Sequence, residues 1–214
     1  MNIFKTTDIK ELLKHQSESV QLSVLNRDKP VGANKLFKKL MQKNFRVIGI
    51  VSKENSIKDI ESLLEKDIPD NLKKDTFYQS WISDMAQICE LFSTITKSKA
   101  VDFCLSTVRG CRRYHIDHVP MRLLVTYAGK GTEWIPDEAA DRKSFENGAP
   151  NEKILKDPLQ RKFMETWDIA IFRGGSQGLL HRTPDAALNE SSILLRLDHE
   201  YFWDKIIKQS KNSV

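Results

Sequence analysis

The chain has few cysteines, no long apolar run and no block of like charge, and each shortage excludes a class of protein. Its 214 residues include only Cys89, Cys104 and Cys111, which form neither a disulfide framework nor a close metal-binding pair. No window approaches the roughly 18 uninterrupted apolar residues of a membrane span. The first residues lack the apolar core of a secretory signal peptide. We therefore expect a cytoplasmic protein without a membrane segment.

Positive charge is in slight excess but is not gathered in one place. The 34 Lys and Arg residues against 29 Asp and Glu residues give a net charge of +5. The lysines are scattered among acids, so the sequence lacks the basic stripe or known motif of a nucleic-acid-binding protein. A chain of this length with 40% hydrophobic residues is typical of one globular domain. The oligomeric state is left open.

The first hundred residues alternate helical and extended patterns and carry no chemical motif. Apolar residues at helical spacing predict four helices, the first capped by Asp8 and the third by Ser56. Alternating apolar residues predict two strands. The helices are expected at 8–18, 33–43, 57–64 and 76–98, and the strands at 20–25 and 45–51.

From residue 100 onward, short extended segments and turn residues dominate. This pattern favours a sandwich or barrel of antiparallel strands. The polar segment 137–160 is expected to be a long loop or to hold a short helix, and residues from 199 onward a helix. Strands are predicted at 101–108, around His115, and at 121–127, 132–135, 168–173, 179–182 and 191–197.

The segment from Arg112 to His118 carries the clearest chemical signal. His115 and Asp117 are two residues apart in a sequence predicted to be extended, so their side chains are expected on the same face. A histidine and a carboxylate on one face are two of the three ligands of a 2-His-1-carboxylate triad, which suits non-haem Fe(II). His181, which follows a hydrophobic strand and a glycine turn, is the candidate third ligand.

The order of these parts resembles the Fe(II)/2-oxoglutarate-dependent dioxygenases of the double-stranded β-helix fold, in their prolyl-hydroxylase-like branch. The whole chain is moreover similar to the bacterial domain-of-unknown-function 1826 family. The first resemblance covers residues 101–198, with Tyr114, His115 and Asp117, the turn with Gly131, Thr132, Trp134 and Pro136, the strand Asp168 to Phe172, and His181. The second rests on residues 111–120, 126–127, 131–134 and 181–184.

The resemblance implies an α+β fold whose C-terminal half is a double-stranded β-helix (a cupin-like jelly roll). Residues 1–100 would form a helix-rich support, residues 101–198 the core with the metal site, and residues 199–214 a C-terminal helix, all within the single domain 1–214. It implies a hydroxylating oxygenase that uses Fe(II) and 2-oxoglutarate on a small molecule or a protein side chain. The metal ligands would be His115, Asp117 and His181.

The sequence departs from the family pattern at the residue that anchors 2-oxoglutarate. In the pattern a basic residue follows the distal histidine by about ten positions, but residues 190–192 here are Glu-Ser-Ser. Arg196 is the best substitute because the guanidinium fork matches a carboxylate. Counted from Ser191, Arg196 has the wrong parity in a regular strand, so a bulge or another register is required. Arg122 and Arg182 are further candidates.

Two other interpretations use the same residues. The chain could be a non-catalytic metal-binding protein, holding zinc with the help of His118 or Cys111. It could instead be a degenerate β-helix that binds a small molecule or a partner, in which Asp117 only orients His115. The substrate of an enzyme is not readable, because specificity would lie in loops such as 137–160 that carry no motif.

Overall fold

The computed structural model describes residues 2–15 and 19–200 and is organised around a seven-stranded mixed sheet. The strand order is β1-β2-β8-β5-β10-β4-β3. Strands β1 and β2 run parallel, and the other neighbouring pairs run antiparallel. The strands are β1 (Ile3–Thr6), β2 (Leu22–Leu25), β3 (Arg46–Ser52), β4 (Ala100–Ser106), β5 (Met121–Ala128), β8 (Ile169–Arg173) and β10 (Ile193–His199).

A small three-stranded sheet packs against one face of the large sheet. Its order is β7-β6-β9, with β6 (Glu133–Trp134) between β7 (Lys162–Phe163) and β9 (His181–Arg182). Side chains from β2, β5 and β8 form one apolar cluster with side chains of the small sheet and its flanking segments. The cluster consists of Leu22, Val24, Leu124, Trp134, Met164, Ala170, Phe172 and Leu179.

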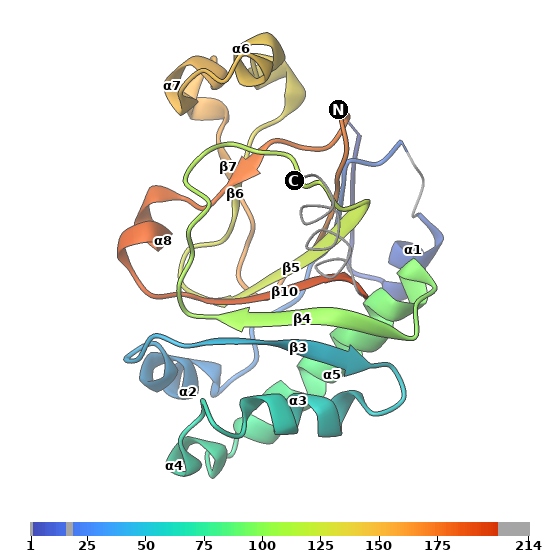
Figure 1. Cartoon of the computed structure of the whole chain (residues 1–214), viewed down its shortest axis with the longest axis vertical. Helices are drawn as coiled ribbons and strands as arrows, with labels where there is room; N and C mark the ends of the chain where they lie inside the picture. Colours follow the sequence, from blue (N-terminus) through green and yellow to red (C-terminus); the bar gives the residue numbers. More distant parts are fainter. Residues whose placement is uncertain (1, 16–18, 201–214) are drawn as a thin grey trace, which may run out of the picture.

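Helices cover the opposite face of the large sheet. Figure 1 shows α2, α3, α4 and α5 on the far side of β3 and β4 from β6 and β7. The main core lies in this layer, where Trp81 of α5 packs edge-on against Phe37 of α2 and Tyr127 of β5. Counting those outside this layer, the α-helices of the described residues are α1 (Ile9–Lys14), α2 (Ala33–Leu40), α3 (Ser56–Leu64), α4 (Asp70–Lys73), α5 (Tyr78–Thr96), α6 (Arg142–Glu146), α7 (Asn151–Ile154) and α8 (Asp185–Asn189).

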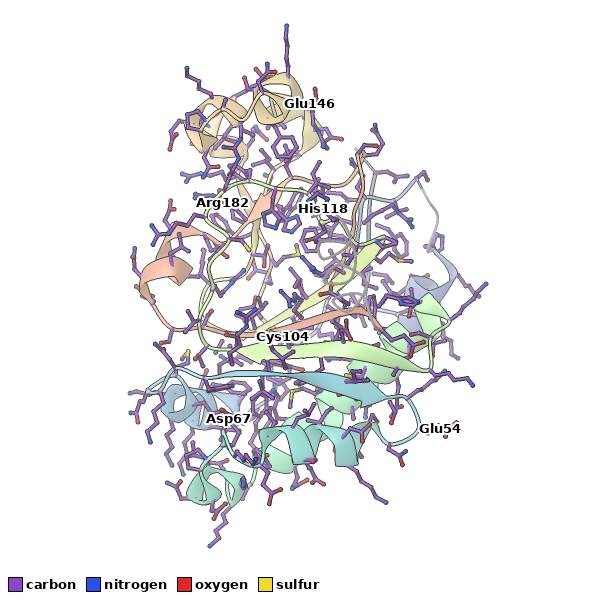
Figure 2. The ribbon with its side chains drawn as sticks, in the orientation of Figure 1. Glu54, Asp67, Cys104, His118, Glu146 and Arg182 are labelled. Carbon is purple, nitrogen blue, oxygen red and sulfur yellow. The ribbon has the colours of Figure 1, made fainter. Side chains whose placement is uncertain are left out.

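Side-chain alternation gives the two faces of the large sheet different chemistry. In β10, Leu195 and Leu197 belong to the core beneath the helices, whereas Arg196 and Asp198 point to the other face. Figure 2 places Arg182 and His118 on that second side of the sheet, while Asp67 lies on the helix side. The chemistry-bearing residues of the second half are thus separated from the helical core.

Most elements predicted from the sequence are confirmed. The N-cap at Asp8 is confirmed, since its carboxylate accepts a hydrogen bond from the Lys10 N–H. The cap predicted at Ser56 is wrong by one residue: Asn55 occupies that position, and the Ser56 hydroxyl instead donates to Glu90 on α5. Segment 137–160 contains α6 and α7 together with two 3-10 turns, Asp137–Ala139 and Pro158–Gln160.

One predicted strand needs correction, and one predicted helix is left untested. The strand expected around His115 is reduced to an isolated bridge between His115 and His181. The helix expected from His199 falls almost wholly on residues 201–214, outside the described residues, and His199 itself ends β10.

The fold is mixed α+β, and residue 100 does not divide its sheet. β3, from the first half, pairs with β4 over seven residue pairs, and β2 pairs with β8. The two halves therefore contribute strands to one sheet. The finer assignment, a double-stranded β-helix core, stays a prediction. No helix within the described residues is long and apolar enough to cross a membrane.

Candidate metal centre

His115, Asp117 and His181 lie together on the sheet face that the helices do not cover. One potential ligand atom from each residue lies within 4.8 Å of the others. The His181 Nε2 atom is 3.3 Å from Asp117 Oδ2, and His115 Nε2 is 3.9 Å from Asp117 Oδ1. His118 and Cys111 are exposed and outside this cluster, which is the sole cluster of its kind in residues 2–15 and 19–200.

Backbone pairing brings the two histidines together. The N–H of each donates to the carbonyl of the other, at 3.0 and 3.1 Å. Residues that exchange both bonds stand directly opposite, so their side chains share a face. The ring centroids are accordingly 4.4 Å apart. His181 is held on its other side by pairing with Trp134 in β6.

A glycine turn after β8 holds the loop that carries Asp117. The Gly175 N–H donates to the Asp117 carbonyl at 2.9 Å, and the Gly174 N–H donates to the Pro120 carbonyl at 3.1 Å. A Cβ atom at Gly174 would lie 1.9 Å from the Val119 carbonyl oxygen and 2.3 Å from that of Asp117. Only a residue without a side chain permits this approach, so Gly174 sets the position of Asp117.

Replacing Gly174 with alanine should therefore destabilise the protein and displace Asp117. Because both clashes involve backbone atoms, we expect a loss of about 1–3 kcal/mol in the free energy of unfolding, measured by urea denaturation. Gly110→Ala is the matched control, since a Cβ there would meet nothing within 4 Å. Equal unfolding midpoints for the two variants would contradict this role of Gly174.

The hydrogen bonds of both imidazoles leave their Nε2 atoms available as ligands. His115 Nδ1 lies 3.0 Å from the Arg113 carbonyl, and His181 Nδ1 lies 2.9 Å from the Leu179 carbonyl. A carbonyl only accepts, so Nδ1 carries a proton in each ring, and Nε2 is the atom that can bind a metal. Burial lowers the pKa of His115 to about 4, helped by the neighbouring His181. His115 is thus neutral at pH 7.

Asp117 offers one carboxylate oxygen without a hydrogen-bond donor. The Arg122 Nη1 atom donates to Oδ1, whereas Oδ2 is buried and receives no hydrogen bond from the described residues. Burial alone would raise the pKa of Asp117, but His181 and Arg122 outweigh it and lower the pKa to about 2. The ionised carboxylate of Asp117 thus lies beside the Nε2 atoms of both imidazoles. Such a donor set suits a divalent cation.

A cavity of 220 Å³ adjoins the two histidines and is unusually rich in arginine. Among the described residues its lining includes no aspartate or glutamate, although carboxylates lie behind some of the arginines. A cavity with this lining favours anionic ligands. The arginines in the lining are Arg46, Arg109, Arg122, Arg182 and Arg196.

Arg122 is held by two buried carboxylates. Besides Asp117, it contacts Asp198 through Nε at 2.7 Å and Nη2 at 3.2 Å. These bonds occupy its guanidinium, and they fix the orientation of the Asp117 carboxylate. This geometry favours a role in positioning Asp117 over the predicted role as a cosubstrate anchor.

Arg182 is engaged in a similar way beside His181. Its Nε atom donates to Glu133 at 3.0 Å, and its two Nη atoms donate to Asp185 at 2.8 and 3.0 Å. Its guanidinium carbon lies 5.2 Å from the centre of the Tyr114 ring, and the Tyr114 hydroxyl also donates to Glu133. The network ties β9 to β6, which makes Arg182 a structural residue in this arrangement.

Arg196 does reach the cavity, and the parity argument against it does not apply. Ser191 lies before β10 begins at Ile193, and the pairing of β10 with β5 shifts register between Ile193 and Leu194. Leu194 and Arg196 then line the cavity together. Arg196 Nε is 3.3 Å from Asp198, a carboxylate that it shares with Arg122. Its role as an anchor stays a prediction.

The cavity also contains Arg109, which the sequence patterns did not single out. It is 9% exposed and follows β4 by three residues. Its Nη atoms donate to the Lys130 carbonyl and the Thr132 hydroxyl, both at 2.8 Å. No motif surrounds Arg109, and its burial depends on the distant turn before β6. A single basic residue after a buried strand was the only sequence signal.

The chain was compared with solved structures, with curated proteins and with protein-family models. The solved structures that match this chain include an Fe(II)/α-ketoglutarate-dependent dioxygenase, TqaL, with 10% identity, a TM-score of 0.44 and coverage of 89% of this chain and 86% of that one. A 2OG-Fe(II) oxygenase family oxidoreductase from Burkholderia pseudomallei has 10% identity, a TM-score of 0.39 and coverage of 92% and 94%. A BsmA homologue from Methylobium petroleophilum has 10% identity, a TM-score of 0.39 and coverage of 89% and 92%.

The search of curated proteins finds no match. A family model does match, over residues 6–198, and its description is "Protein of unknown function (DUF1826)". The match covers nearly the whole chain, including all three residues of the candidate centre, and it confirms the resemblance to this family noted from the sequence. The chain belongs to the DUF1826 family.

Proposed function

We propose that this protein is a non-haem Fe(II)- and 2-oxoglutarate-dependent oxygenase that hydroxylates a small molecule or a protein side chain. The observation that carries the proposal is the convergence of His115, Asp117 and His181 at the wall of an arginine-lined cavity. Two imidazole nitrogens and one carboxylate leave coordination positions open on Fe(II). The similar solved structures that are named oxygenases have TM-scores below 0.5, and the proposal does not rest on them.

The residues present fit the metal. The buried Oδ2 atom of Asp117 has no hydrogen-bond donor among the described residues. The Asp117 carboxylate lies beside two Nε2 atoms whose rings are fixed through Nδ1. A backbone carbonyl behind each imidazole and a guanidinium behind the carboxylate are the outer contacts that orient metal ligands in proteins.

Metal binding, positioning and cosubstrate binding would fall to different residues of the chain. His115, Asp117 and His181 would bind Fe(II), which together with a 2-oxo acid and O₂ supplies the oxidising chemistry. Arg122 would hold Asp117 in place. The cavity arginines would attract the anionic cosubstrate, and the cluster around Phe172 and Trp134 would limit water behind the ligands. The substrate would enter the same cavity beside the histidines.

A non-catalytic zinc site is the second candidate. The same three ligands could hold Zn²⁺, which commonly takes histidine and carboxylate donors. Neither His118 nor Cys111 lies in the cluster to complete a closed four-ligand site. A structural zinc site is usually closed by four protein ligands, so the geometry favours an open, catalytic-type centre.

Anaerobic metal and cosubstrate titration tests the proposal. Protein purified without oxygen should bind one Fe(II), and addition of 2-oxoglutarate should then produce a visible charge-transfer band. Tight zinc with no such band would favour the second candidate. Failure to bind either metal would contradict both and favour a module that binds a small molecule or a partner through the same cavity.

A further inference from the structure

Arg109 is a buried cation without a carboxylate partner in the part of the chain that the structure describes. Its two Nη atoms meet neutral acceptors, the Lys130 carbonyl and the Thr132 hydroxyl. Its Nε atom is buried and has no hydrogen-bond partner. Burying a guanidinium without a counter-charge costs free energy, so proteins rarely keep such a group without a ligand or a function.

Arg109 differs in this respect from the other arginines of the cavity. Arg122 is paired with Asp117 and Asp198, and Arg182 with Glu133 and Asp185. Arg196 approaches Asp198 at 3.3 Å. Arg46 is exposed, so water can solvate its charge. Among the cavity arginines and the residues that the structure describes, the buried charge without a carboxylate partner is therefore that of Arg109.

We infer that Arg109 binds the carboxylate of the 2-oxo acid that is remote from the metal. The inference rests on the proposed function. Arg109, His115 and His181 line one cavity, so a ligand in it can meet the two histidines and the guanidinium together. A carboxylate there would provide the missing counter-charge and accept a hydrogen bond from Nε, an arrangement for which guanidinium is well suited.

The surroundings of Arg109 hold it rigidly enough for this task. Thr132, which fixes one Nη atom, is 2% exposed and precedes β6. Gly131 lies so close to the chain that a Cβ there would be 1.8 Å from the Met164 carbonyl oxygen. The same turn thus positions Arg109 and, through the pairing of β6 with β9, His181. A preorganised anchor of this kind reduces the cost of ordering the ligand.

The test compares a dicarboxylate with a monocarboxylate. The affinities of 2-oxoglutarate and pyruvate for the Fe(II) protein are measured without oxygen, by calorimetry and by the visible band, in the native protein and in Arg109→Gln. Pyruvate keeps the 2-oxo acid group but lacks the remote carboxylate. We expect the native preference for 2-oxoglutarate to fall on the order of 100-fold in Arg109→Gln, with the pyruvate affinity little changed. Arg109→Lys should restore part of the preference.

Arg46→Gln and Arg196→Gln are the matched comparisons from the same cavity. Each should change the preference much less than Arg109→Gln does. If either removes the preference while Arg109→Gln retains it, Arg109 is not the anchor, although the proposed function stands. If the native protein gives no band with either acid, the proposed function itself fails. Thermal unfolding of the metal-free variants establishes that each is folded.

Discussion

Replacing His181 with alanine is expected to weaken Fe(II) binding by well over 100-fold. His181 is 3% exposed, and its Nε2 atom, the candidate metal ligand, lies 3.3 Å from Asp117 Oδ2. Loss of a contact behind a ligand already costs about 10–100-fold in metal affinity, and loss of the ligand itself should cost more. The affinity is measured by anaerobic calorimetry with Fe(II). His115→Ala should have a comparable effect.

His118→Ala is the matched control, because His118 is three residues from His115 but exposed and outside the cluster. It should bind Fe(II) like the native protein. Since alanine at position 181 also removes a ring that packs on Phe172, the unfolding of the metal-free variant is measured in parallel. Unchanged Fe(II) affinity in a folded His181→Ala variant would rule out the proposed centre.

Replacing Arg182 with methionine is expected to destabilise the protein by about 3–5 kcal/mol. Arg182 is 7% exposed, and its removal leaves the Glu133 carboxylate, itself 1% exposed, without its cation. The Tyr114 hydroxyl alone cannot compensate a buried negative charge. The free energy of unfolding is measured by urea denaturation. The unpaired charge of Glu133 accounts for more of this loss of stability than the lost ion pair does.

A double variant separates these two contributions. Adding Glu133→Gln to Arg182→Met removes the unpaired negative charge of Glu133, so part of the lost stability should return. Arg112→Met, at an exposed position, should stay within about 0.5 kcal/mol of the native protein. If Arg182→Met is fully stable but fails to bind 2-oxoglutarate, Arg182 is an anchor and not a structural residue.

Local patterns were sufficient to predict most elements of the fold. The helical spacing in 76–98 corresponds to α5, and the alternation in 45–51 corresponds to β3. The Ser56 cap failed because its hydroxyl bonds to Glu90, a contact between two helices that no local pattern reveals. The strand at His115 failed because only one bridge partner, His181, is available to it.

The sequence by itself determined the candidate ligands, since a His-x-Asp pair, a glycine turn and a later histidine are local features with fixed spacing. Only the tertiary structure decided which arginines form ion pairs with carboxylates. Arg122 and Arg182 were candidate anchors because of their residue type and position, yet carboxylates distant in sequence engage both. Arg109, which has no motif, is buried beside Thr132 without a counter-charge from the described part of the chain. Charge pairing acts through space, so it is set by the fold.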